Sequence, residues 1–193
     1  MSKNPEKSGW SVRSIAICAL LTALSVILAR LLIPMPNETT RFSIEAVPIF
    51  IAGMLFGPLP GAFTGFAADF IGCLFTPYGY NPIFCVPPIL YGLLAGLVRR
   101  YVLEKSTLPR TALAFFPAAL LGSVLWQSMA LALVYGGEAK EAFFLAKLVS
   151  RGIQFALTAS VDTLIVWLLL RRGALSGVQR HIQAKGGRKH DDP

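Results

Sequence analysis

Five long apolar runs with few charges dominate the sequence. An α-helix needs about 20 apolar residues to cross a bilayer, and most of the runs are near that length. A sixth, shorter candidate covers residues 46–56. The chain is 54% hydrophobic and 15% charged, which is too apolar for a soluble domain of 193 residues. We therefore predict a single all-α membrane domain. The five long runs are residues 15–33, 59–75, 83–98, 112–135 and 142–170.

Positive charge decides between five and six spans. Five spans put the termini on opposite sides of the membrane, whereas six put them on the same side. With six, the N-terminal stretch, the connection after residue 98 and the C-terminal tail share one face, and they hold thirteen of the eighteen Lys and Arg residues. The cytoplasmic face of a membrane protein is the positive one. The charges therefore predict six transmembrane helices with both termini in the cytoplasm.

The predicted topology divides the chain into three parts. Residues 1–11 are a cytoplasmic N-terminal segment, residues 12–172 are the six-helix membrane domain, and residues 173–193 are a basic cytoplasmic tail that we expect to be disordered. The net charge of +8 follows from this topology. The positive net charge therefore does not indicate nucleic-acid binding. We expect membrane lipid to surround the helices.

Glycine spacing predicts how some of these helices pack. Gly57, Gly61 and Gly65 follow at four-residue intervals around the start of the run 59–75, and Gly92 and Gly96 do so in the run 83–98. Small residues at this spacing let helices approach each other closely in lipid. We interpret them as packing residues.

Four cations lie at or beside the outer end of the predicted bundle, where positive charge should be scarce. They are Arg30, Arg41, Lys147 and Arg151. Charge at membrane depth is costly and usually belongs to a ligand or a pathway. Because an Arg can bind a carboxylate through two parallel hydrogen bonds, we take Lys147 and Arg151 as the first candidates for an anionic ligand, and Arg41 as the next. Arg30 could bind such a ligand, or its side chain could simply extend so that the charged end reaches the outer membrane–water interface.

A polar stripe runs through the otherwise apolar run 142–170. Its residues follow one another by three or four positions, which puts them on one helical face. One interpretation is a ligand site. The other is an internal network that stabilises the bundle, above all at its deepest residue, Asp162. The stripe consists of Lys147, Arg151, Gln154, Thr158 and Asp162.

Asp69 and a set of aromatic and amide residues are further candidates. Asp69 interrupts the run 59–75, and it could pair with Arg151 or accept hydrogen bonds from ring N–H groups of a flat heterocycle. Aromatic side chains could stack on such a ring or anchor the chain at the interface. The set comprises Tyr78, Tyr80, Asn81, Phe84, Tyr91, Trp126 and Gln127.

The apolar part of the sequence lacks the motifs of common enzyme classes. It has no Walker A, HExxH or GxSxG sequence. Cys18, Cys73 and Cys85 lack the spacing and the His partners of a metal site. We therefore expect three buried thiols, no metal, no cofactor and no ATPase in this chain.

Short blocks between residues 41 and 72 resemble the substrate-binding S components of energy-coupling factor (ECF) vitamin transporters, and most of all the folate-specific FolT group. The Gly57-Pro58 and Ala68-Asp69 blocks, at their separation, are the most specific part. The blocks are Arg41-Phe42-Ser43, Val47-Pro48-Ile49, Ala52-Gly53-Met54-Leu55-Phe56-Gly57-Pro58, Gly61-Ala62, Gly65, Ala68-Asp69 and Ile71-Gly72.

The resemblance implies the S-component fold. It has six helices with both termini in the cytoplasm, and it lies as a multi-pass protein in the prokaryotic cell membrane. A vitamin pocket near the outer face is formed by the last three helices and by the first, third and fifth loops. The residues that fall in suitable places are Arg41, Trp126, Gln127, Lys147 and Arg151.

The resemblance also implies partners. Ala19 and Ala23 match the AxxxA motif by which the first helix docks on a transmembrane coupling subunit, and two cytoplasmic ATPases supply the energy. The leading hypothesis is high-affinity binding of a folate-like vitamin at the outer face, without chemical change, followed by uptake. An S component for pantothenate, riboflavin or thiamine, a small membrane enzyme and an assembly protein are the alternatives.

Overall fold

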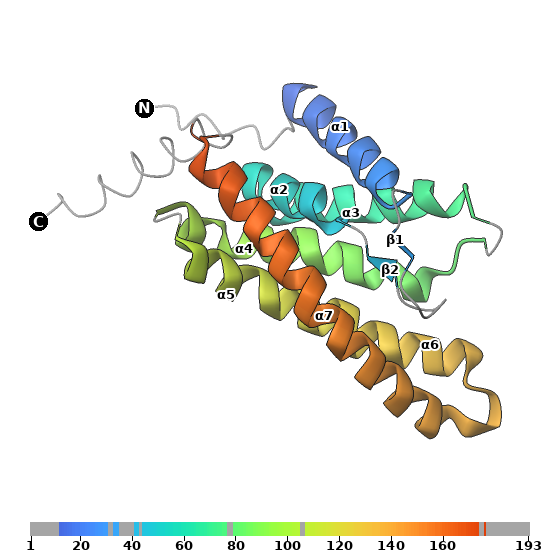
Figure 1. The fold of residues 1–193 in the computed structure, drawn as a ribbon. Coiled ribbons are helices and arrows are strands. Elements are labelled where there is room, and N and C mark those ends of the chain that lie inside the picture. Colours follow the sequence, from blue (N-terminus) through green and yellow to red (C-terminus); the bar gives the residue numbers. More distant parts are fainter. Residues whose placement is uncertain are drawn as a thin grey trace, which may run out of the picture.

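In a computed structural model, the described residues form a bundle of helices (Figure 1). The structure describes residues 12–30, 33–34, 41–42, 44–76, 79–104, 107–173 and 176. The predicted N-terminal segment 1–11, most of the predicted tail 173–193, Tyr78 and the side chain of Arg41 lie outside this description. The three-part division of the chain therefore stays a prediction.

Each of the six apolar runs contains at least one helix. The run 112–135 is divided by a π-helix, η2, into three consecutive segments without a break. A pair of two-residue strands, β1 and β2, lies between the first two helices, where Ile33 pairs with Phe42. The longer elements are α1 (Val12–Leu28), α2 (Ala46–Phe56), α3 (Pro58–Cys73), α4 (Val86–Glu104), α5 (Leu108–Ala119), η2 (Leu120–Trp126), α6 (Gln127–Tyr135) and α7 (Lys140–Arg171). The short ones are β1 (Ile33–Pro34), β2 (Arg41–Phe42), η1 (Pro82–Phe84) and η3 (Gly137–Ala139).

Helix length supports three membrane crossings directly. The helical stretches Pro82–Glu104, Leu108–Tyr135 and Gly137–Arg171 are long and apolar enough to cross, while α1 and α2 are shorter apolar helices. The 11 residues of α2 rise only about 16 Å, roughly half of the hydrocarbon thickness. Six crossings therefore remain a prediction that rests on charge.

The helices α2, α3 and α4 meet backbone to backbone through their glycines. A methyl group added to Gly92 would lie 2.0 Å from the carbonyl oxygen of Gly61, and one added to Gly96 would lie 2.2 Å from the nitrogen of Pro58. One added to Gly65 would lie 2.1 Å from a carbonyl oxygen of α4. The predicted packing role of these glycines is confirmed.

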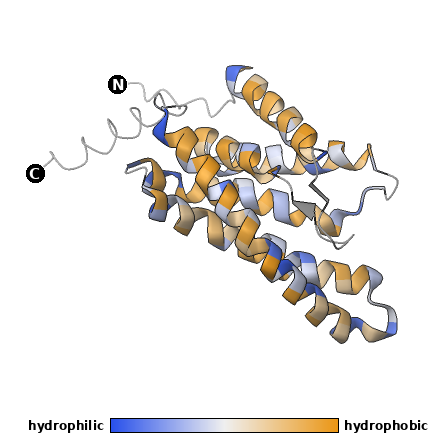
Figure 2. Ribbon diagram, viewed as in Figure 1, coloured by the Kyte–Doolittle hydropathy of each residue, from blue (hydrophilic) through white to orange (hydrophobic). Residues whose placement is uncertain are grey.

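Aromatic side chains fill the space between these three helices and the second half of the chain. Phe50 of α2 and Phe115 of α5 are fully buried, with ring centroids 4.9 Å apart. Tyr91 of α4 lies 5.7 Å from the Phe115 ring. Apolar residues also cover most of the outer surface (Figure 2), as a lipid surrounding requires. The polar residues within the bundle are therefore the exceptions that need an explanation.

Candidate functional site

The polar stripe of α7 faces the other helices. Asp162 is only 3% exposed, and the other four stripe residues are half-buried. The opposite side of the helix is apolar and exposed, with Val149 65%, Ile153 66% and Leu157 54% accessible. The predicted one-sided arrangement is therefore confirmed, and the stripe is the part of α7 that can contact an enclosed ligand.

Arg151 is the central cation of this face, and most of its hydrogen-bonding capacity is unused. Its Nη1 donates to the carbonyl oxygen of Ser123 at 3.4 Å, which is a long hydrogen bond. Its buried Nε has no partner among the described residues. A guanidinium carries five N–H donors, so this side chain retains the fork that binds a carboxylate.

Ser123 reaches this position because it belongs to the π-helix η2. Pro117, at the end of α5, has no N–H for the helical ladder, and the wider helix begins three residues later. Such single π-helical turns are frequent at functional sites. The sequence analysis missed this feature, and Pro117 was the signal that could have indicated it.

Tyr91 links residues from four parts of the fold. Tyr91 of α4 is within hydrogen-bonding reach of Ser123 and interacts electrostatically with Arg151 and Asp162. Glu45, directly before α2, interacts electrostatically with Tyr91 and Asp162. We call Glu45, Tyr91, Ser123, Arg151 and Asp162 the inner cluster. The sequence analysis placed neither Glu45 nor Ser123 in a site.

The inner cluster contains charged atoms that lack protein partners. Within the described part of the chain, neither Oδ1 of Asp162 nor Nε of Arg151 has a hydrogen bond, although both are buried. Buried polar atoms are almost always paired, because leaving one unpaired costs free energy. Two such open polar atoms on the inward face of α7 are the feature that a polar ligand could complete.

Lys147 lies one turn of α7 further out than Arg151. Its Nζ is 5.2 Å from the centroid of the Phe143 ring, on the same helix. This contact holds the ammonium group half-buried on the inward face without using its three hydrogen-bond donors. The two cations therefore offer donors at neighbouring depths.

The connection between α3 and α4, which we call the third connection, contacts Trp126, at the end of η2, and Tyr135, the last residue of α6. The indole N–H of Trp126 donates to the carbonyl oxygen of Ile83 at 2.8 Å, and Oδ1 of Asn81 accepts from the amide of Ile83 at 3.2 Å. The rings of Phe84 and Tyr135 stack with centroids 6.4 Å apart. Trp126, Asn81 and Phe84 thus hold this connection in place.

Gln127 follows Trp126 directly and is half-buried. Within the described residues its amide makes no hydrogen bond; the hydrogen bonds of this region are those of Trp126 and Asn81 with Ile83. Gln127 therefore keeps both a donor and an acceptor for a ligand.

Asp69 lies in a different group from Arg151. Its carboxylate is hydrogen-bonded with the Cys85 thiol and lies near Cys73. The Tyr80 ring packs edge-on against Phe70, with centroids 5.2 Å apart. Between the two described side chains of Asp69 and Arg151 there is no ion pair. The pairing considered from the sequence is therefore wrong, because the two helices α3 and α7 present these charges to different neighbours.

Arg30 has a structural contact as well. It is exposed, and its guanidinium donates to the carbonyl oxygen of Gly72, near the C-terminal end of α3. A cation there complements the partial negative charge of the helix end. This contact favours a role in joining α1 to α3.

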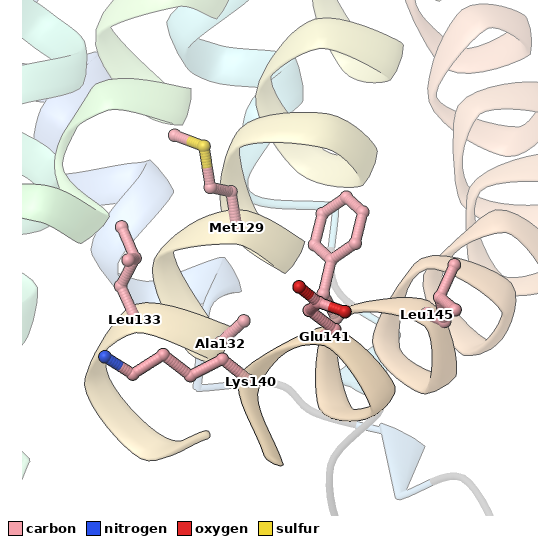
Figure 3. A pocket seen from close by; sticks show the side chains of 7 residues that line it. Met129, Ala132, Leu133, Lys140, Glu141 and Leu145 are labelled. Atoms are coloured by element: carbon pink, nitrogen blue, oxygen red, sulfur yellow. The ribbon is translucent and has the colours of Figure 1, made fainter. Parts of the chain in front are cut away.

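A hollow on the surface lies elsewhere. It has a volume of about 370 Å³ and is lined by Met129 and Leu133 of α6 and by Leu145 of α7 (Figure 3). Lys140 and Glu141 stand at its rim. No inner-cluster residue lines this hollow, and its walls are almost entirely apolar. It cannot recognise a polar heterocycle, so we place the candidate site at the inner cluster.

Ala19 and Ala23 lie on the outside of the bundle. Both are exposed, while Cys18, Thr22 and Ser25 form the buried side of α1. Nothing in the described structure packs this small-residue strip inside the protein. The surface is thus available to another chain.

Comparisons with known proteins agree with this architecture. A family model described as ECF-type riboflavin transporter, S component, matches residues 9–171. The chain is 25% identical over 144 residues to the folate transporter FolT of Clostridium novyi, covering 74% of this chain and 81% of that one. It is 26% identical over 129 residues to the uncharacterized MG098 homologue of Mycoplasma pneumoniae; this covers 62% of the chain but only 26% of that protein's length.

Solved structures share the fold. A crystal structure of FolT bound with folic acid superposes with a TM-score of 0.69 at 26% identity, covering 83% of this chain and 94% of that one. ThiT from Listeria monocytogenes gives 0.62 at 17% identity, covering 84% and 96%. The S-component for biotin of an ECF-type ABC transporter gives 0.52 at 19% identity, covering 89% and 95%. The expected helical S-component fold is confirmed, while the six crossings and the cytoplasmic position of both termini stay predictions.

Proposed function

Because this chain belongs to the family of ECF-type riboflavin transporter S components, it is the substrate-binding subunit of a vitamin transporter and not an enzyme, and we propose that its vitamin is a folate. The family description names riboflavin, whereas the relative from Clostridium novyi and the folic acid complex name folate. The chemistry of the candidate site favours the second substrate.

The observation that carries the proposal is the pair of open cations on the inward face of α7. Among the described residues, Arg151 makes one long hydrogen bond with its five donors, and the described contact of Lys147 is with an aromatic ring. A folate carries a glutamate tail whose carboxylates can use both cations, because charge-assisted hydrogen bonds between such groups are the strong ones. Riboflavin has no carboxylate, so it would leave these charges unpaired in the bundle.

The aromatic and amide residues beside the cations supply the other half of the binding site. We place Trp126 and Phe84 there because their contacts join the third connection to η2 and α6, and Gln127 because it follows Trp126 directly. Tyr80, Asn81 and Asp69 support the same connection from the α3 side. The ligand enters from the outer face and is bound without chemical change. Arg41 and Tyr78 complete this proposed set.

Members of this family work with energy-coupling partners. We propose that these are a transmembrane coupling subunit and two cytoplasmic ATPases, and that the chain crosses a prokaryotic cell membrane six times. The exposed strip of Ala19 and Ala23 on α1 is the docking surface for the coupling subunit. Small residues there allow a partner helix to come close to the α1 backbone.

A vitamin screen with the purified protein tests the proposed substrate. Folic acid, riboflavin, thiamine and pantothenate are added separately, and the thermal unfolding of the protein is followed. A ligand that binds only the folded protein stabilises it by mass action. We expect folic acid to raise the unfolding temperature and the other three vitamins to leave it unchanged. Stabilisation by riboflavin and none by folic acid would overturn the proposal.

A further inference from the structure

We infer that the hollow between α6 and the start of α7 binds one phospholipid, with an acyl chain in the hollow and an ethanolamine headgroup at its rim. Such a headgroup carries an anionic phosphate and a primary ammonium group. The hollow is separate from the inner cluster, so the inference does not depend on which vitamin the protein binds.

The hollow is apolar and open to the surroundings of the bundle. Its volume of about 370 Å³ falls in the range of about 300–1,000 Å³ that is usual for small-molecule sites. Buried Ala132 and half-buried Phe144 are among its lining residues, while Met129, Leu133 and Leu145 are 39%, 54% and 60% exposed. Atoms that line an unfilled hollow lose the dispersion contacts that a filled one provides. In a membrane, an acyl chain is the apolar group at hand to provide them.

Exposed apolar side chains continue the hollow along both helices. Residues that follow at four-residue intervals lie on one side of a helix, and α6 and η2 both pack on α7. The lane on α7 covers 12 residues, or about 18 Å along the axis, and the hydrocarbon of one leaflet is about 15 Å deep. An extended acyl chain therefore finds an apolar track as long as one leaflet. The lanes are Leu145, Val149, Ile153 and Leu157 on α7, and Leu133, Met129, Leu125 and Leu121 on α6 and η2.

Two opposite charges stand at the polar end of this track. Lys140 and Glu141 are adjacent in the sequence, both are exposed, and both line the hollow. Their side chains make no hydrogen bond or ion pair with any described residue, and Figure 3 shows their charged ends pointing to different sides. Tyr135, 58% exposed at the end of α6, marks the same level, because tyrosines gather where a membrane meets water. The charges thus lie where a lipid headgroup lies.

This pair of charges distinguishes between headgroups. A phosphate beside Lys140 and a primary ammonium beside Glu141 satisfy both side chains, since such an ammonium has three N–H donors. A choline headgroup has no N–H to donate, and a glycerol headgroup brings its negative phosphate close to Glu141 without a cation. One exposed ion pair changes an affinity by about fivefold at most. The headgroup therefore sets a preference, while the acyl chain supplies most of the binding.

Native mass spectrometry of the full-length protein tests the inference. The protein in detergent is incubated with an equimolar mixture of phosphatidylethanolamine, phosphatidylglycerol and phosphatidylcholine that carry the same acyl chains, and the lipids that remain bound are counted. We expect one retained phospholipid per chain, with phosphatidylethanolamine about fivefold more abundant than each of the others. Equal retention of the three lipids by the native protein would overturn the inference.

Two variants at the rim test the role of each charge. Glu141→Gln should abolish the preference for phosphatidylethanolamine, because the carboxylate that accepts from its ammonium is gone. Lys140→Gln should lower retention of all three lipids, because each of them has a phosphate. Glu104→Gln is the matched control, since it removes an exposed carboxylate at the far end of α4 and should keep the native preference. An unchanged preference in Glu141→Gln would overturn the assignment.

A variant that fills the hollow tests where the acyl chain lies. Leu145→Trp places a larger side chain in the hollow and should lower retention of every lipid at least about fivefold. Leu113→Trp makes the same kind of change at a position on α5 that is 62% exposed and outside the hollow, and it should retain lipid like the native protein. If Leu145→Trp does not fold, the preference in Glu141→Gln still decides.

The remaining outcomes separate a lipid from other occupants and from the vitamin site. Native lipid retention in a folded Leu145→Trp variant would put the lipid elsewhere and overturn the inference. The same retention together with loss of copurifying ATPases would show that a protein partner covers the hollow, which also overturns it. Folic acid affinity, measured in the same variants, should stay native, so failure of the lipid site and failure of the proposed vitamin are distinguishable.

Discussion

Replacing Arg151 with alanine should weaken folic acid binding strongly while leaving the protein folded. In the absence of ligand, the substitution removes one described hydrogen bond, 3.4 Å long, to Ser123, and it relieves the unpaired Nε. In the presence of ligand it leaves a folate carboxylate without its fork of donors. Truncating one partner of a buried charge pair costs about 2 to 5 kcal/mol, which is roughly thirtyfold to several thousandfold in Kd. Since Arg151 is half-buried, we expect a loss near the lower end of this range.

Calorimetric titration with folic acid measures this loss, and thermal unfolding without ligand shows that the variant is folded. Arg151→Lys keeps the charge without the planar fork, so its affinity should lie between those of the native protein and Arg151→Ala. Arg100→Ala serves as the matched control, because this exposed arginine belongs to the opposite end of the bundle. A folded Arg151→Ala variant with native affinity would refute the assignment of the anion site to α7.

Three further predictions concern packing, assembly and the third connection. Gly92→Ala should lower the unfolding temperature by several degrees, because overpacking costs about 1–3 kcal/mol and each kcal/mol corresponds to roughly 2–4 °C. Gly152→Ala should leave the unfolding temperature unchanged, because nothing lies within 4 Å of the added methyl group. Equal unfolding temperatures of the two variants would contradict the close packing of α3 on α4. Ala19→Leu should prevent copurification with the coupling subunit and ATPases while folic acid affinity stays native, and intact assembly would count against docking through α1. Trp126→Phe should speed folic acid dissociation in stopped-flow measurements, because the indole hydrogen bond at 2.8 Å to the third connection is lost; an unchanged rate would remove this residue from the site.

Much of the fold follows from local properties of the sequence. Apolar runs in lipid must form helices because their backbone groups have no other partners, and each predicted run does contain a helix. The four-residue glycine spacing predicted the contact between α3 and α4. Any residue other than glycine would place a Cβ atom in this contact, and at Gly92 that atom would lie 2.0 Å from a carbonyl oxygen. The inward orientation of Arg151 and Asp162 followed from helical periodicity.

What could not be predicted depends on contacts between distant segments. Periodicity places Asp69 and Arg151 on helical faces, but the depth and rotation of α3 and α7 decide that their charges do not meet. Glu45 joins the inner cluster because α2 is short and begins within the bundle, and its apolar neighbours in the sequence give no indication of this position. The shift that exposes the Ser123 carbonyl arises from the π-helix, a change in hydrogen-bond register that leaves the apolar pattern intact.

The central proposal is that the inward face of α7 binds a folate. Calorimetric titration of the purified native protein with folic acid and, separately, with riboflavin tests it most directly. We expect saturable binding of folic acid with one site per chain and no heat of binding with riboflavin. Saturable binding of riboflavin, with none for folic acid, would contradict the claim.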